Sequence, residues 1–222
     1  EVGKATVDKF YSEAANKPSR VCKAYADFRE LLDKADVDAI QICAPDHWHC
    51  YMAVAAARKG LHLYGQKPLA LTVGEGRRMV SEIAKAGVTW QTGSQQRSDI
   101  DFRLVSELAR NGRIGKVKRV RIGLPGGHKN WNQWADRTAP EPVPRDFDYD
   151  MWLGPAPLRP YNEKRVHYNF RFWWDYSGGQ MTNWGAHHID IAQWALGFEK
   201  SGPVKLAGTS KFGTVVPPNF NW

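Results

Sequence analysis

The sequence is poor in cysteine, and its three cysteines, Cys22, Cys43 and Cys50, lack the spacing of metal ligands. Because an odd number cannot all pair within one chain, reduced thiols are favoured. No apolar run is long enough to span a membrane, and no signal peptide is recognisable. The sequence is compatible with a cytoplasmic protein and with one exported to the periplasm, because we expect its N-terminus to be a cut end.

A glycine-rich phosphate-binding turn is also missing. A dinucleotide fold normally opens with a strand and a G-x-G-x-x-G turn whose amides hold the pyrophosphate, and nothing before Ala5 supplies one. The nearest match, GEGRRM at 74–79, lies inside an expected helix. The C-terminal PPNFNW stops before the second half closes. We therefore expect the chain to be the middle of a longer protein.

Charge of one sign is not concentrated anywhere. The net charge of +8 comes from 31 Lys and Arg scattered among 23 Asp and Glu. The densest basic stretch, RIGKVKRVR at 113–121, alternates with apolar residues as a strand with one wet face would. This pattern disfavours nucleic acid as a partner and favours a small anionic cofactor or substrate.

What the sequence does contain is an alternation of strands and helices on short connections. Strands are expected over 38–45 (buried and stopped by proline), 61–65 and 88–93, and helices over 5–15, 27–34, 47–60, 72–87 and 101–112. Capping boxes are predicted at Asp27 with Glu30 and at Thr72 with Glu75. The alternation predicts an α/β fold with a parallel sheet covered by helices.

The regular alternation of strands and helices ends after Gly112. Alternation predicts a strand over 115–124, a helix returns at about 181–196, and a strand-like piece follows at 204–209. We therefore expect a truncated Rossmann-type domain over 1–116. A partial α+β domain with an open mixed sheet should follow over 117–222.

Lys67 is the best catalytic candidate. It follows the strand at 61–65, and Pro68 restricts it to extended geometry, so the side chain is aimed. A partly buried lysine has a lowered pKa and can donate or accept a proton. The alternative is an exposed lysine in a turn.

A second cluster lies in GGQMTNWGAHHIDIAQWALG at 178–197. Asn183 and His187 are four residues apart on a predicted helix and share a face, so we expect Asn183 to position His187 for proton transfer. The alternative is that His187 and His188 are packed helix residues. A metal site with Asp190 is disfavoured, because adjacent histidines point to different faces.

Tryptophans crowd the irregular segment between these clusters. Flat aromatic faces suit sugar rings, yet tryptophans also pin long loops to a core, and the sequence leaves both open. They are Trp131, Trp134, Trp152, Trp173 and Trp174.

The order of CAPDHWH, QKPLALT, GSQQRSD, NGRIGKV and SGGQMTNWGAHHIDIAQWALG resembles the Gfo/Idh/MocA oxidoreductases, from about residue 21 to 197. The resemblance implies an NAD- or NADP-dependent enzyme that acts on a sugar, a cyclitol or a related polyol. It also implies a Rossmann domain followed by a domain whose sheet joins subunits into a dimer or tetramer. No nucleic acid, membrane or metal is expected.

The resemblance implies roles for individual residues. Lys67 matches the lysine of the family's Glu-Lys-Pro signature, and His187 matches its catalytic histidine. Two positions depart from the pattern, because Gln66 and Asn183 are amides where the family has carboxylates. The expected cofactor contacts are Pro45, Asp46, His49, Gln66, Lys67, Gln96 and Arg97. The expected substrate contacts are Trp173, Asn183, His187 and His188.

Two alternatives to a dehydrogenase remain. One is a glycosidase or lyase that works by transient sugar oxidation, with an additional base among His128, Tyr161 and His167. The other is a non-catalytic sugar- or nucleotide-binding relative, motivated by the two amides and the missing phosphate-binding turn.

Overall fold

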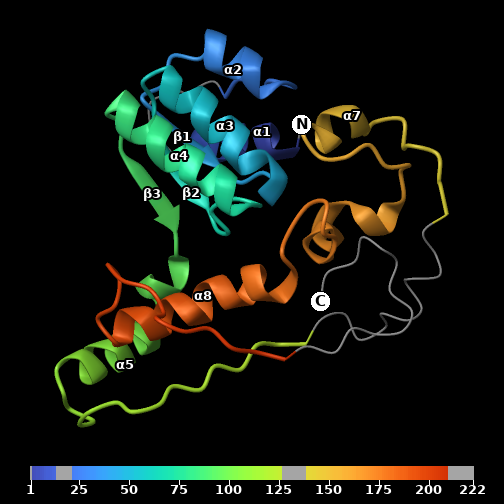
Figure 1. The fold of residues 1–222 in the computed structure, drawn as a ribbon. Helices are drawn as coiled ribbons and strands as arrows, with labels where there is room; N and C mark the ends of the chain where they lie inside the picture. The colour runs from blue at the N-terminus through green and yellow to red at the C-terminus, as the bar shows by residue number, and fades with distance from the viewer. Residues whose placement is uncertain (1, 14–21, 127–138, 210–222) are drawn as a thin grey trace. The chain divides into compact units, whose positions relative to one another are not determined.

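The computed structural model describes residues 2–13, 22–126 and 139–209 (Figure 1). The chain divides into two compact units, 1–37 and 38–222. The first unit contains α1 (Val2–Glu13) and α2 (Phe28–Lys34). Asp27 caps α2, accepting a hydrogen bond from the main-chain N–H of Arg29 at 2.8 Å. Glu30 pairs with Lys34 instead of reaching back, so the cap is confirmed and the reciprocal box is not formed.

The second unit begins with a three-stranded parallel sheet. Its strands are β1 (Ala39–Ile42), β2 (His62–Gln66) and β3 (Trp90–Gly93), in the order β1-β2-β3. Ile42 pairs with Gly65, and Gln66 pairs with Gly93, so the carboxyl ends of the strands meet at one edge. The α/β expectation is confirmed. The expected burial of β1 is wrong in part: only Ile42 is buried, because β1 pairs on one side only among the described residues.

Helices α3 (Asp46–Arg58) and α4 (Val73–Ala86) make the two crossovers between these strands. α3 packs against β1, β2 and α4, and Figure 1 shows both helices on the same side of the sheet. Small buried alanines on α3, such as Ala53 and Ala56, allow this close packing. Thr72 and Glu75 form the predicted capping box of α4, and Gly87 ends the helix with a φ of +68°.

In the rest of the second unit, the regular elements of the described ranges are helices joined by irregular segments. Its elements are η1 (Gln95–Ser98), α5 (Ile100–Arg110), α7 (Tyr149–Leu153), η2 (Glu163–Arg165), η3 (His167–Phe172) and α8 (Gly179–Ala195). α8 confirms the helix expected near 181–196, and it contacts α5, η1 and η3. No described helix is long and apolar enough to cross a membrane.

The strands expected over 115–124 and 204–209 are not formed. Both segments lack the regular hydrogen bonds of a ladder, and Val204 is fully exposed. Alternation of apolar and polar residues indicates a two-faced strand, but a strand also needs a partner, and the described residues offer none. The domain boundary near Lys116 and the sheet that would join subunits stay predictions.

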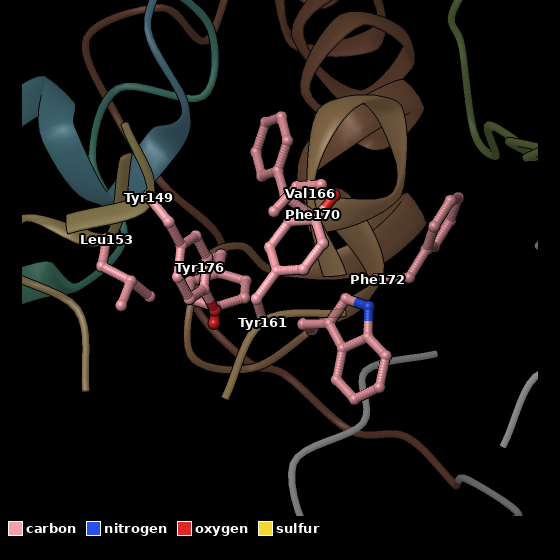
Figure 2. Close-up of a cluster of buried hydrophobic side chains, with 8 residues drawn as sticks. Tyr149, Leu153, Tyr161, Val166, Phe170, Phe172 and Tyr176 are labelled. Atoms are coloured by element: carbon pink, nitrogen blue, oxygen red, sulfur yellow. The ribbon is translucent and has the colours of Figure 1, made fainter. Parts of the chain in front are cut away.

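An aromatic core holds the irregular segment before α8 (Figure 2). Rings of Tyr149 and Tyr161 meet edge to face at 5.2 Å, and those of Trp152 and Tyr176 at 4.8 Å. Each such pair adds about 0.5–1.5 kcal/mol beyond its buried area. Trp173 is also part of this core, at 1% exposure. Trp131 and Trp134 lie outside the described residues.

The start of α3 is joined to the end of α7. Trp48 Nε1 donates to the carbonyl oxygens of Met151 and Trp152, both at 3.1 Å, and His47 Nε2 lies 2.9 Å from Trp152 O. Gly154 follows with a φ of +48°, and a Cβ built there would lie 1.9 Å from the Trp48 ring. The contact between these segments therefore depends on a residue without a side chain at 154.

Candidate active site

A cavity of about 380 Å³ opens at the carboxyl ends of β1 and β2. In open α/β sheets this edge is where ligands bind. One wall comes from the segments that follow the two strands, and the other comes from η3 and the start of α8. The lining residues are Cys43, Ala44, Pro45, Asp46, Gln66, Lys67, Pro68, His167, Phe170, Arg171, Ser177 and Asn183.

Lys67 lies at the end of β2 and reaches across this cavity to α8. Its Nζ donates to the main-chain oxygen of Asn183 at 2.9 Å and to Asn183 Oδ1 at 2.8 Å. Burial, and then the charge of Arg171, lower the pKa of Lys67, while Asp46 opposes the shift. The lysine is therefore half-buried and held, and it is not an exposed turn residue.

The two amides have partners that differ from those expected. Gln66 Oε1 accepts from the main-chain N–H of Lys67 at 2.9 Å, so Gln66 supports the backbone and not the amine. The side-chain Nδ2 of Asn183 donates to Gln180 Oε1 at 3.1 Å, and the buried Nδ1 of His187 has no hydrogen-bond partner, so the expected link from Asn183 to that nitrogen is not formed. The helical spacing placed Asn183 and His187 on one face, but the nearby ammonium is the stronger partner for the amide oxygen.

His187 is half-buried one turn further along α8, and it does not line the cavity. Burial, and then the charges of Lys67 and His188, lower its pKa, so the neutral ring is favoured. Its Nδ1 is buried with no hydrogen-bond partner. A neutral histidine with an open ring nitrogen, close enough to Lys67 for their charges to interact, is suited to accepting a proton.

Arg97 forms an ion pair with α8, and its expected cofactor contact stays a prediction. Its Nε and Nη2 donate to the two carboxylate oxygens of Asp190 at 2.7 and 2.6 Å. The guanidinium also lies over the ring of Trp194 at 5.4 Å. Both groups of the ion pair are thus committed to joining η1 to α8.

Asp46 is a buried carboxyl group in the cavity wall, at 5% exposure. Ser177 Oγ donates to it at 2.5 Å, which joins the start of α3 to the segment before α8. Burial raises the pKa of Asp46, and the hydrogen bond from Ser177 and the charges around it oppose that shift. Pro45, which precedes Asp46, lines the cavity as expected.

His49 is 2% exposed and does not line the cavity. Its Nδ1 lies 2.7 Å from Pro68 O and its Nε2 lies 2.8 Å from Ala44 O. Both ring nitrogens face carbonyl oxygens, and a contact of His49 with the cofactor stays a prediction. The ring joins the segment after β1 to the segment after β2.

Three other expected site residues also lie outside the cavity. His188 Nδ1 lies 3.1 Å from Gly123 O, with its ring beside Phe102, since consecutive helix residues point in different directions. Trp173 belongs to the aromatic core and donates its Nε1 hydrogen to Lys164 O. Gln96 has a buried Oε1 without a hydrogen-bond partner.

Sequence reasoning missed Arg171 and Ser177, which the structure brings to the cavity. The available signal for Arg171 was a single basic residue among aromatics in NFRFWW. His167, considered only as an additional base, also lines the cavity, while Tyr161 lies in the aromatic core and His128 is outside the described residues. Among the described residues, no three His, Cys, Asp or Glu side chains form a group that could hold a metal ion.

Two family models cover most of the chain. Residues 5–94 match the oxidoreductase family model described as an NAD-binding Rossmann fold, and residues 98–211 match the corresponding C-terminal alpha/beta domain. The chain belongs to the Gfo/Idh/MocA oxidoreductase family. The resemblance drawn from its motifs is therefore confirmed.

Members of the Gfo/Idh/MocA family with curated names include sugar and cyclitol enzymes. The myo-inositol 2-dehydrogenase of Thermotoga maritima is 33% identical over 177 residues, which cover 80% of this chain and 41% of that protein. The 1,5-anhydro-D-fructose reductase of Ensifer adhaerens is 32% identical over 100 residues, covering 45% and 30%. The crystal structure of an oxidoreductase domain protein from Kribbella flavida is 28% identical with a TM-score of 0.55, covering 78% and 38%. The chain thus spans about two fifths of the Thermotoga relative.

Proposed function

We propose that this chain forms the reaction cavity of an NAD- or NADP-dependent dehydrogenase of sugars, cyclitols or related polyols. The observation that carries the proposal is the half-buried Lys67 amine, held by two oxygens of Asn183 in a cavity at the strand ends. Family membership and the names of the relatives support the same class of reaction.

The cavity fits a nicotinamide. Pro45 and Phe170 offer apolar faces to a flat ring, and Gln66 adds an amide group for its carboxamide. The segments that hold these residues follow parallel strands, the usual position of a dinucleotide. When bound there, a nicotinamide supplies the acceptor for a hydride from the substrate.

Lys67 takes the hydroxyl proton of the substrate in this proposal. Because burial lowers its pKa, a larger fraction of the amine is neutral near physiological pH than for an exposed lysine. After the transfer, the two oxygens of Asn183 stabilise the ammonium through charge-assisted hydrogen bonds. Burial, and then the charge of Lys67, lower the pKa of His187, so this histidine, which does not line the cavity, stays neutral when the amine takes up the proton.

The test is a turnover assay of the full-length protein with NAD and NADP over a panel of inositols, hexoses and alditols. We expect reduced nicotinamide to accumulate with at least one polyol, and Lys67→Met to lower kcat by about 100-fold or more while cofactor affinity changes little. Absence of turnover with every substrate, together with absence of cofactor binding, would rule the proposal out.

One observation favours a second candidate, hydrolysis or elimination through transient oxidation of a sugar. His167 lines the same cavity as Lys67, so an additional base is available to remove a C–H proton made acidic by the neighbouring ketone. In that case a glycoside would release free sugar with catalytic cofactor and without accumulating reduced nicotinamide. His167→Asn would stop the release while leaving the first oxidation in place.

A further inference from the structure

Arg171 contributes an arginine without an acidic partner to the cavity wall. Its Nη1 donates to the main-chain oxygen of Tyr168 at 3.1 Å, and within the part of the chain that the structure describes no carboxylate pairs with it. Two other half-buried arginines are paired, Arg97 with Asp190 and Arg159 with Asp175. Arg165, which lies over the ring of Trp173 at 4.1 Å and does not line the cavity, has a buried Nη1 without a hydrogen-bond partner. A half-buried guanidinium with free donors in a cavity is unusual, because buried charges are normally paired.

The guanidinium is fixed in place before any ligand arrives. It lies over the rings of Phe170 at 4.6 Å and Tyr168 at 4.8 Å, which restricts its plane. His167, at the start of the same short helix, has a φ of +52°, a conformation that non-glycine residues seldom adopt. Such backbone is retained where the surrounding structure demands it, and here it places His167 at the cavity beside Arg171.

Arg171 is the charged donor in the cavity wall that has no carboxylate hydrogen-bond partner among the described residues. Lys67 is held by Asn183, and the carboxyl group of Asp46 accepts a hydrogen bond from Ser177. Arg171 acts electrostatically on both Lys67 and Asp46. A ligand with a single negative charge would therefore give Arg171 the anionic partner that it lacks.

We propose that Arg171 recognises a carboxylate of the substrate, so that the cavity takes a sugar acid, a hexuronic or aldonic acid, in preference to a neutral sugar or polyol. This inference rests on the proposed dehydrogenase function. The planar guanidinium matches a carboxylate through two parallel hydrogen bonds, while His167 is placed to bond a neighbouring hydroxyl group. A phosphate, with close to two charges, would exceed the one positive group that is free.

The experiment compares matched pairs of substrates in the full-length protein: glucuronate with glucose, and gluconate with glucitol. We expect the wild type to favour each acid over its neutral partner by at least about tenfold in kcat/KM. Arg171→Gln should lower kcat/KM for the acids by about 10- to 100-fold, the effect of losing hydrogen bonds to a charged group. The neutral partners should change less than about twofold.

Two further variants separate geometry from charge and from fold. Arg171→Lys keeps the charge without the fork of donors, so we expect an intermediate loss for the acids. Arg145→Gln removes an exposed arginine outside the cavity and should leave every ratio unchanged. Circular dichroism and the melting temperature of each variant confirm that it is folded.

Several results would overturn the inference while leaving the dehydrogenase in place. They are equal use of acids and neutral partners by the wild type, an equal loss for both in Arg171→Gln, a preference for hexose 6-phosphate, and a loss of NAD or NADP affinity in Arg171→Gln. If nothing is turned over, the proposed function fails. Calorimetric titration of the wild type and Arg171→Gln with glucuronate then decides the inference alone, and absence of an Arg171-dependent difference rejects it.

Discussion

Lys67 Nζ lies 2.8 Å from Asn183 Oδ1 and 2.9 Å from the main-chain oxygen of the same residue. One side chain from the end of β2 and one residue of α8 thus form a single unit across the cavity. Because Asn183 is neutral, the lysine receives hydrogen-bond acceptors without a compensating negative charge. A negative charge at position 183 would therefore stabilise the ammonium form of Lys67 further.

Asn183→Asp should move the pH profile of oxidation to higher pH. A carboxylate at this position favours the ammonium form and raises the pKa of Lys67, so less neutral amine is present at a given pH. The measurement is kcat/KM against pH. Gln180→Glu is the control, because Gln180 contacts Asn183 and not Lys67, and its shift should be much smaller. Equal shifts would contradict the assignment, and activity that arises only in Gln66→Glu combined with Asn183→Asp would favour the non-catalytic alternative.

His49→Ala should destabilise the protein and lower kcat, although His49 does not line the cavity. The change removes the ring that faces Ala44 O and Pro68 O, and loss of the one hydrogen bond that a neutral imidazole donates costs about 1–3 kcal/mol. Loss of the contact to Pro68 also frees the segment that carries Lys67. Urea unfolding and steady-state kinetics measure the two effects. His49→Gln, which keeps one donor group, should fall between the wild type and His49→Ala, and an unchanged kcat in both variants would refute a positioning role.

His47 should make stability dependent on pH below neutrality. Burial lowers its pKa in the folded state below the ordinary 6.5, so the unfolded chain binds the proton more tightly. The stability contribution is therefore complete above about pH 6.5 and is lost as the pH falls through and below that value. The melting temperature from pH 8 to 5 should fall less in His47→Gln than in the wild type. A melting temperature that falls equally in both proteins would contradict this assignment to His47.

Gly154→Ala should lower the free energy of unfolding by about 2–4 kcal/mol. A side chain there combines an unfavourable positive φ with overpacking against the Trp48 ring. Gly60→Ala is the matched control, because Gly60 has a φ of +79° but open space around it, so it carries the backbone cost of about 1 kcal/mol alone. Chemical denaturation measures both variants. Equal losses of unfolding free energy in the two variants would show that the close contact with the Trp48 ring adds no cost at position 154.

The elements with strong local signals could be predicted from the sequence. Thr72 and Glu75 begin α4, Gly87 ends it, and Gly197 follows the end of α8, because caps and left-handed glycines act within a few residues. The strands expected at 115–124 and 204–209 are not formed, since a strand requires a partner that periodicity does not identify. The exposure of most of β1 also reflects pairing, because among the described residues β1 pairs with β2 alone.

In the candidate site, Lys67 could be predicted from the sequence, whereas the partner of Asn183 and the role of Arg171 could not. Lys67 stood out because a strand end and Pro68 fix its direction. Helical spacing gave the face of Asn183 correctly, but the identity of its partner depends on where β2 ends in space. Arg171 lies in a short helix without periodicity, so its importance emerges only from the cavity and from the absence of an acidic partner among the described residues.

Cys43, in the cavity wall, is an exposed residue whose Sγ accepts a hydrogen bond from Gln41 Nε2 at 3.3 Å, whereas Cys50 is buried with its Sγ 3.6 Å from Glu75 O. The protein therefore carries a natural attachment point for an environment-sensitive fluorophore beside Lys67. Covalent labelling at this position turns ligand entry into an optical signal. Protection of the thiol from an alkylating reagent gives an occupancy measurement that requires no turnover.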